Sequence, residues 1–252
     1  MNIQAQQYSE YERHGWDSGP QSLLHVESDW ASLGEIMELL RYKPKIPPAS
    51  RAHLFRRRRL RAGQPLYMME QQFSGLYVIR RGCFKSVIRK SCGDEHVISF
   101  SMRGDLLGTD GICKDIYRCE SVALCDSDVI RVPSDDIFAM DRNSDDVERM
   151  LYWATSTEMS REIAAYALTH SSKSEVRVAR FLASQSGRFF ELGFSPLRFT
   201  LAMTRREIGS YLNVTLETVS RALTSLSRCG IIDVSLREIT ILSLEDLSNY
   251  EG

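Results

Sequence analysis

The segment 204–226 constrains the fold most tightly, because it reads as two short helices joined by a tight turn. Thr204 and Glu207 have the spacing of a capping box, in which two residues satisfy N–H groups at the start of a helix. Thr215, at the end of the turn, is a good N-cap for the second helix. The second helix has an apolar stripe at i, i+3, i+4 and i+7, formed by Val219, Ala222, Leu223 and Leu226.

A polar stripe runs along the same helix, shifted around its axis, and consists of Glu217, Ser220, Arg221 and Thr224. A small helix that buries one face and displays a short polar face suits the major groove of DNA. An ordinary helix pair whose polar side meets water gives the same pattern. The sequence after the pair favours DNA, since 231–234 and 238–242 read as a two-stranded hairpin. Together these elements predict a winged helix-turn-helix.

The charge of this region also fits a nucleic-acid partner. Residues 170–234 hold nine basic side chains against five acidic ones, in a chain whose formal net charge is −1. Such a local basic excess is what binding to the phosphates of double-stranded DNA requires.

Two long motifs resemble one family. The run GFSPLRFTLAMTRREIGSYLNVTLETVSRAL resembles the DNA-binding domain of the Crp/Fnr transcription regulators, on the Fnr side. The earlier run GLYVIRRGCFKSVIRKSCGDEHVISFSMRGDLLGTDGI is similar to the sensor β-roll of that family. The resemblance covers residues 58–242 approximately, with the two motifs in the family's order.

The resemblance implies an α+β fold with three parts. These are an N-terminal cyclic-nucleotide-binding-like β-roll (jelly roll), a long dimerisation helix and a C-terminal winged helix-turn-helix. We expect a flexible N-terminus over 1–28, the sensor roll with flanking helices over 29–142, the dimerisation helix over 143–170 and the DNA-binding domain over 171–252.

Hydrophobic periodicity gives the expected elements of the roll. A helix capped by Asp29 is predicted over Trp30–Tyr42, and the arginine run 56–59 reads as a solvated face or a strand entry. Short strands punctuated by glycine are predicted over Pro65–Met68, Leu76–Arg80, Phe84–Arg89, His96–Phe100, Asp105–Leu107, Arg118–Ala123 and Asp128–Val132. Strands at this spacing are typical of a barrel or roll.

A long helix is expected over Asp145–Thr169. The residues at 3-4 spacing that predict a coiled-coil seam, and so a homodimer, are Val147, Met150, Ala154, Thr157, Arg161, Ala164 and Leu168. The residues off this seam, which are expected to pack on the roll, are Leu151, Met159, Ile163 and Tyr166. A single buried helix is the alternative.

The polar stripe suggests roles in reading DNA. Arg221 is expected to donate to a guanine edge, Glu217 to accept from a cytosine amino group, and Ser220 to contact a neighbouring base. Thr215 and Thr218 are expected to hold phosphates at the helix N-terminus. The resemblance implies a palindromic site with TTGAT half-sites.

The resemblance also implies activation of transcription through contact with RNA polymerase. The matching surfaces are the turn with Asp94 and Glu95, and the turn with Ser195. The first turn lies in the roll, so it is expected to act independently of DNA reading.

The signal is left open by the sequence. The Fnr branch senses oxygen with a [4Fe–4S] cluster, but this chain has no cysteine before Cys83 and has Ile130 in place of the roll cysteine, so no metal or other cofactor is expected. The Crp branch binds cyclic AMP through a glutamate and an Arg-Ser pair, whereas this chain has Thr109 and Arg118-Cys119. Arg118 suits an anion, but the set is incomplete.

Two other functions stay open. A thiol-redox regulator on the same scaffold would use the thiol of Cys229, which follows the reading helix, or Cys113, Cys119 and Cys125. A cyclic-nucleotide-binding regulatory subunit of a partner enzyme would need only the roll. Enzymatic activity is not expected, because GxSxG, Gly-Lys phosphate-loop and HExxH signatures are absent.

The N-terminus has no apolar signal-like run, and no apolar run approaches membrane-spanning length. A cytoplasmic location is therefore expected, without a membrane partner, and the six cysteines are expected to be thiols.

Overall fold

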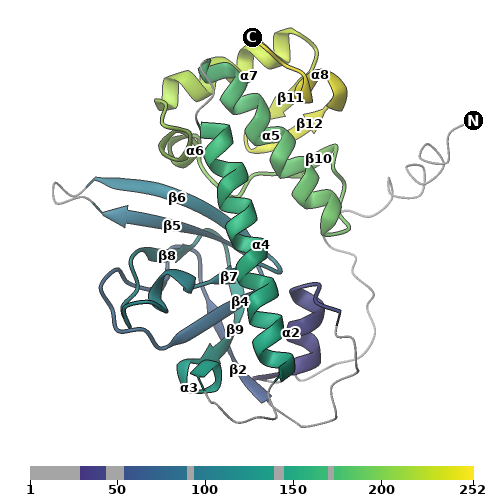
Figure 1. The fold of residues 1–252 in the computed structure, drawn as a ribbon. Helices are drawn as coiled ribbons and strands as arrows, with labels where there is room; N and C mark the ends of the chain where they lie inside the picture. Colours follow the sequence, from purple (N-terminus) through teal and green to yellow (C-terminus); the bar gives the residue numbers. More distant parts are fainter. Residues whose placement is uncertain (1–28, 44–53, 90–93, 139–144, 170–172) are drawn as a thin grey trace, which may run out of the picture.

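The computed structural model describes residues 29–43, 54–89, 94–138, 145–169 and 173–252. A roll of strands lies at one end of the long helix α4, Asp145–Thr169, and a helical domain with a small sheet lies at the other (Figure 1). We call residues 29–138 the roll and residues 173–252 the winged domain. The predicted flexible N-terminus, 1–28, lies outside the described residues. None of the helices in the described ranges combines the length and the apolar character that spanning a bilayer requires.

The roll consists of two antiparallel sheets around one apolar core. In order across the first sheet, the strands are β1 (Trp30–Ser32), β2 (Leu54–Leu60), β9 (Ser127–Pro133), β4 (Gly75–Arg81) and β7 (Leu106–Leu107). In the second sheet they are β3 (Pro65–Tyr67), β8 (Glu120–Ala123), β5 (Cys83–Arg89) and β6 (Glu95–Met102). The short helices of the roll are α2 (Leu33–Leu39), η2 (Thr109–Gly111) and α3 (Ser134–Phe138). The predicted strands are thus present, with ends shifted by one or two residues.

The start of the roll differs from the prediction. Residues 30–32 form β1, paired with β2, so the helix begins later than expected. Its N-cap is Ser32, whose hydroxyl accepts from Glu35 N at 3.2 Å, and not Asp29. The arginine run lies within β2, where alternation turns Arg57 inward against Asp128. Residues 30–32 form a strand rather than the predicted start of the helix, because β2, distant in sequence, supplies their hydrogen-bond partners.

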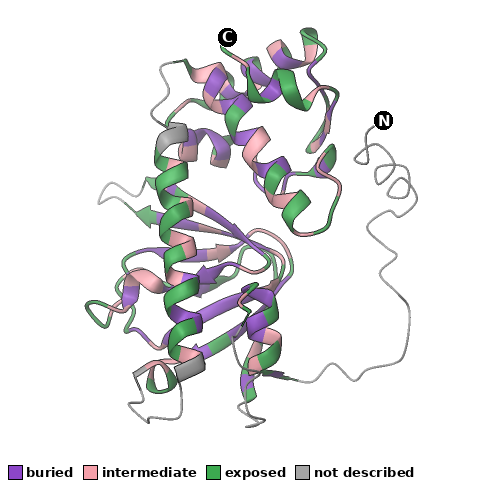
Figure 2. Cartoon of the chain, turned by 45° about the vertical axis from the view of Figure 1, so that its right-hand side comes forward, coloured by how far each residue is buried: buried purple, intermediate pink, exposed green. Residues whose placement is uncertain are grey.

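The long helix α4 packs on the roll with the face that was predicted to form the dimer seam. Met150 is 0% exposed and Ala154 is also buried, both within the core of the roll. Arg161 of the predicted seam donates to Asp105 of the roll. Large apolar side chains occupy another face and are exposed: Tyr152, Met159, Ile163 and Tyr166. The assignment of the two faces was therefore wrong, except that Leu151 is buried as expected. Figure 2 shows exposed positions recurring along the helix.

The winged domain begins with α5, Ser174–Glu191, followed by the helix pair α6, Arg205–Leu212, and α7, Leu216–Arg228. The predicted hairpin is present as β11, Ile232–Ser235, and β12, Glu238–Ile241. A third strand that the sequence pattern did not predict, β10 (Arg198–Thr200), pairs with β12, and α8 (Leu244–Ser248) ends the domain. The core of this domain extends to roll residues of β5 and β6, so the two parts share apolar contacts.

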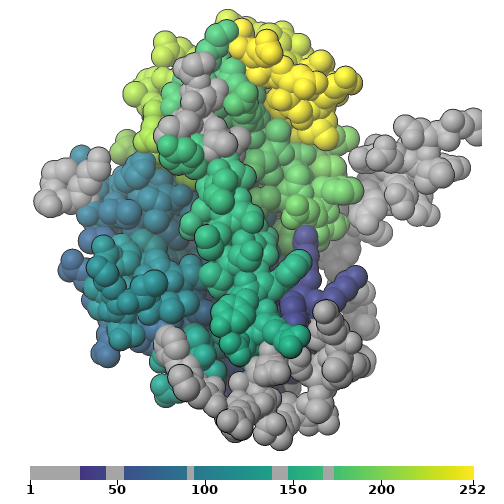
Figure 3. All heavy atoms as spheres, viewed as in Figure 1, coloured from purple at the N-terminus to yellow at the C-terminus, as the bar shows by residue number. Residues whose placement is uncertain are grey.

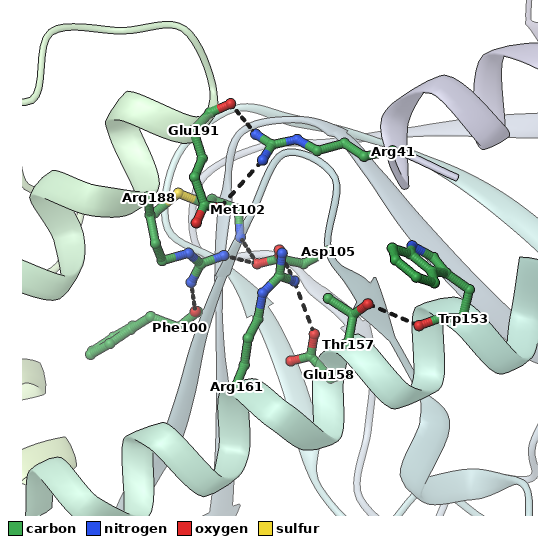
Figure 4. Close-up of polar contacts among 10 residues, drawn as sticks. All are labelled: Arg41, Phe100, Met102, Asp105, Trp153, Thr157, Glu158, Arg161, Arg188 and Glu191. Atoms are coloured by element: carbon green, nitrogen blue, oxygen red, sulfur yellow. Dashed lines mark hydrogen bonds and ion pairs between the residues drawn. The ribbon is translucent and has the colours of Figure 1, made fainter. Parts of the chain in front are cut away.

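A charged cluster also joins the roll, α4 and α5 (Figure 4). Asp105, in the β6–β7 turn, is only 1% exposed and accepts from Arg161 of α4 and Arg188 of α5. Its carboxylate also accepts from Met102 N at 2.7 Å. Arg161 Nη1 lies 3.2 Å from Glu158 Oε2. One buried carboxylate therefore links three parts of the chain.

Glu158 makes stability depend on pH. Burial, with the nearby Asp105 carboxylate as a second cause, raises the pKa of Glu158 from 4.5 to about 7, although Arg161 and Arg188 oppose the shift. The folded state thus holds this proton more tightly than the unfolded chain. The resulting stability is present below the unfolded pKa and is lost as pH rises through 7. We expect the free energy of unfolding to fall by about 1–3 kcal/mol between about pH 5 and pH 8 from this group.

Denaturant titrations at several pH values measure this loss. Glu158→Gln, which keeps the neutral form, should remove that part of the pH dependence, whereas Glu162→Gln on the exposed side of α4 should not. Identical pH profiles for wild type and Glu158→Gln would contradict the assigned shift.

Candidate nucleic-acid interface

The turn between α6 and α7 is specified by local contacts. Thr204 N donates to Glu207 Oε2 at 2.7 Å and Glu207 N to Thr204 Oγ1 at 3.2 Å, which is the predicted capping box. The turn itself begins at Asn213, whose φ of 54° is left-handed. A Cβ on Gly209 would lie 2.8 Å from the carbonyl oxygen of Val214. A glycine is therefore needed where the turn approaches α6.

The second helix is anchored by the predicted cap and stripe. Thr215 Oγ1 accepts from Thr218 N at 3.2 Å, and this bond closes the N-terminus of α7. All four residues of the predicted apolar stripe are buried: Val219, Ala222, Leu223 and Leu226. The polar face consequently points outward, with Glu217 and Arg221 exposed and Ser220 half-buried.

The outward face brings the predicted reading residues together. Arg221 Nη2 lies 3.4 Å from Thr218 Oγ1, one turn before it. The pKa of Glu217 is lowered by its own backbone N–H group at the helix start, by Thr215 and by the guanidinium groups of Arg221 and Arg206. Glu217 is therefore a carboxylate acceptor at neutral pH. The face carries both an ionised acceptor and a forked donor, the chemistry that base edges require.

One residue of this face was not singled out from the sequence. Arg205, at the first position of α6, lies with Nη1 3.4 Å from Ser220 Oγ. Its only signal in the sequence was its contribution to the basic excess. The second guanidinium group extends the cationic face across the helix pair and suits a phosphate beside the groove.

Residues 90–93, the start of the turn before β6, lie outside the described residues, whereas Glu95, the first residue of β6, contacts the winged domain. Glu95 pairs with Arg89 at 2.9 Å and with Lys85 at 3.3 Å, and Lys85 also pairs with Glu207 of the capping box at 3.0 Å. The Glu95 carbonyl oxygen lies 3.4 Å from Ser210 Oγ of α6. Glu95 thus lies beside the helix pair, and the independence of this turn from DNA reading stays a prediction.

Ser195 lies in the turn between α5 and β10. Its hydroxyl oxygen accepts from Leu197 N at 3.3 Å and from Arg198 N at 3.2 Å. These bonds fix the backbone of the turn, which precedes the small sheet.

The cysteines differ in burial. Burial raises the pKa of both Cys83 and Cys119 to about 12, so both stay protonated and poorly nucleophilic. Cys113 and Cys229 are exposed and Cys125 is half-buried. No three side chains of His, Cys, Asp or Glu come together as a metal site in the part of the chain that the structure describes.

A carboxylate lies at the positions where the resemblance places a cyclic phosphate. Asp110 Oδ2 accepts from Arg118 N at 2.7 Å and from Cys119 N at 3.1 Å, so a carboxylate already holds these two backbone N–H groups. Behind them, Tyr67 stacks on Tyr117 with ring centroids 4.0 Å apart, and both rings are buried. Negative charge and packed aromatic rings oppose a nucleotide there.

Comparisons with known proteins agree with this arrangement. Residues 176–250 match the Crp-like helix-turn-helix domain and residues 57–144 match the cyclic nucleotide-binding domain. The transcriptional regulatory protein btr of Bordetella pertussis is 32% identical over 77% of this chain and 80% of its own length. The fumarate and nitrate reduction regulatory protein of Escherichia coli is 32% identical over 78% of this chain and 79% of its own.

Solved structures agree as well. FixK2 from Bradyrhizobium japonicum superposes with a TM-score of 0.69 at 26% identity, covering 79% of this chain and 98% of that chain. Three findings lead to one conclusion. The relatives are 32% identical over more than three quarters of this chain, two family domains match in order, and the capped helix pair has an exposed polar face. The chain belongs to the Crp/Fnr family and is a DNA-binding transcription regulator of that type.

Proposed function

We propose that the protein binds a palindromic DNA site with TTGAT-type half-sites as a homodimer, and activates transcription there. The observation that carries the proposal is the outward face of α7, which displays Glu217, Ser220 and Arg221 from a helix anchored on its other side. Arg221 donates to a guanine, Glu217 accepts from a cytosine amino group, and Ser220 contacts a neighbouring base. Thr215 and Thr218 hold phosphates at the helix start.

A dimer is needed because a palindrome presents two equal half-sites, and two-fold symmetry places one recognition helix at each. The exposed apolar face of α4 supports it. Tyr152, Met159 and Tyr166 follow each other at intervals of seven residues and Ile163 follows Met159 by four, which is coiled-coil spacing. Figure 3 shows α4 lying open along one face of the molecule, where a second copy has access.

The docking is tested by Arg221→Ala. Loss of a forked contact to one base pair in each half-site should weaken specific binding by about 1–3 kcal/mol and relax discrimination at that pair. Arg228→Ala is the matched control, since Arg228 is exposed at the far end of the same helix. Affinities for specific and random duplexes are compared at fixed salt. Unchanged discrimination in Arg221→Ala would refute the assigned docking.

Contact with RNA polymerase is proposed for Asp94, Glu95 and Ser195, because Asp94 and Glu95 are exposed and Ser195 is half-buried in a turn whose Gly193 and Phe194 are exposed. Glu95 also contacts the winged domain, directly at Ser210 and indirectly through Lys85, so Asp94→Lys is the cleaner variant. We expect it to reduce transcription from a promoter with an adjacent operator while operator affinity is retained. Transcription and operator affinity are both measured for Asp94→Lys and for the wild type. An equal loss of operator affinity would assign the effect to DNA binding instead.

A thiol switch is the second candidate. Cys229 is exposed and caps the C-terminus of α7, so modification there would disturb the docking of that helix. Cys229→Ser would then bind DNA independently of oxidant, whereas wild type would not. Equal responses to oxidant would exclude this cysteine. The regulatory-subunit alternative receives no support from the roll, where the Asp110 carboxylate holds the backbone N–H groups of Arg118 and Cys119.

A further inference from the structure

A cavity lies where the roll, α2, α4 and α5 meet (Figure 4). Its volume of about 300 Å³ falls at the lower end of small-molecule sites. Its walls come from the end of α2, the β6–β7 turn, one face of α4 and the last turn of α5. The site is separate from the positions around Arg118 at which the resemblance places a cyclic phosphate. It contacts the roll and the winged domain together.

One wall of the cavity is apolar. Leu39 at the end of α2 and Leu40 after it, both buried, lie there with Leu192, which follows α5. Trp153 of α4 lies on the same cavity and is 51% exposed, unusually open for an indole beside a packed interface. Tyr42 lies near the Trp153 ring, with centroids 6.4 Å apart. A bound apolar group would remove much of the Trp153 ring from water.

The charged lining favours an anion. Four guanidinium groups face three carboxyl groups: Arg41, Arg103, Arg161 and Arg188 against Asp105, Glu158 and Glu191. Asp105 is already shared by two arginines, and burial raises the pKa of Glu158 to about 7, so part of its negative charge is absent at neutral pH. Arg103 is exposed at the rim. A planar guanidinium group there matches a carboxylate.

We infer that this cavity binds a small organic carboxylate with an apolar body. The carboxylate is held by Arg103, with Arg41 beside it, and the body lies over Trp153. Arg41 Nη1 already pairs with Glu191 Oε2 of α5 at 3.3 Å, so an anion at Arg41 changes how α2 is tied to the winged domain. Occupancy thereby couples to the orientation of that domain, a consequence that rests on the proposed DNA-binding function.

Calorimetric titration of the full chain tests the site without DNA. The probes are phenylacetate and octanoate, with acetate lacking the apolar body and phenylacetamide lacking the charge. Phenylacetate or octanoate should bind saturably, and both controls should bind at least about tenfold more weakly. Arg103→Gln should weaken the probe by a similar factor, and Trp153→Leu should weaken phenylacetate. Arg56→Gln, an exposed arginine of β2 outside the cavity, should leave affinity unchanged.

The outcomes test the binding site and its coupling to DNA binding separately. Binding of neither probe, equal binding of phenylacetamide, or unchanged affinity in Arg103→Gln would overturn the site. Operator affinity is then measured with saturating probe. A change in wild type that is absent in Arg103→Gln supports coupling. Probe binding without any change in operator affinity would retain the site and overturn its coupling, whereas loss of all specific DNA binding would concern the proposed function alone.

Discussion

Asp105→Ala is expected to lower the free energy of unfolding by about 3 kcal/mol, near the lower end of what breaking a buried ion pair costs. The substitution leaves Arg188 and Arg161 without their common carboxylate, and Arg188 is mostly buried. It also removes the acceptor of Met102 N, which holds the β6–β7 turn. The lower end applies because about a third of the Arg161 side chain meets solvent, and water partly replaces the lost partner.

Denaturant unfolding at neutral pH measures this effect. The matched control is Glu238→Ala, which removes the carboxylate of the exposed pair with Arg198 and should cost less than about 1 kcal/mol. Asp105→Asn keeps an acceptor and should fall between the two. Equal stability of Asp105→Ala and Glu238→Ala would show that the cluster does not join the roll to the winged domain energetically.

Ile163→Asp is expected to convert the proposed dimer to a monomer and to weaken binding to the full palindrome by about 10² to 10⁴-fold. Ile163 is 68% exposed in the single chain and lies in the middle of the exposed apolar stripe. A carboxylate placed there would be buried without a partner in a paired seam. Each monomer would then bind one half-site alone, without the gain in effective concentration that the second contact provides.

Ala164→Asp is the matched control, because it places the same charge on the next residue of the helix, outside the stripe. Ala164 belongs to the face first predicted as the seam, so the pair of variants distinguishes the two assignments directly. Light scattering reports mass and a half-site duplex reports intrinsic affinity. A dimeric Ile163→Asp together with a monomeric Ala164→Asp would restore the first assignment. Met150→Asp is unsuitable, since Met150 is fully buried in the roll and its loss would disturb folding.

Local chemistry explains why the helix pair was predictable. Thr204, Glu207 and Thr215 act on backbone groups within three residues, so their spacing in the chain already fixes their contacts. The stripe of α7 has one apolar face and one polar face, which leaves a single way to bury it. The hairpin of the wing was predictable because its two strands are neighbours in the chain. The strand β10 was not predictable, because it is only three residues long and needs β12 to form its hydrogen bonds.

Local sequence therefore specifies the elements whose contacts are near in the chain, and with them the face that displays Glu217 and Arg221. Only the folded structure shows which of the two apolar faces of α4 packs on the roll. Periodicity in the sequence reveals that both faces are apolar, but it does not reveal what each face packs against. The folded structure also decided that Asp105 joins Arg161 and Arg188 from 56 and 83 residues away. A buried charge is stable only with a partner, and that partner comes from wherever the folded chain brings an opposite charge.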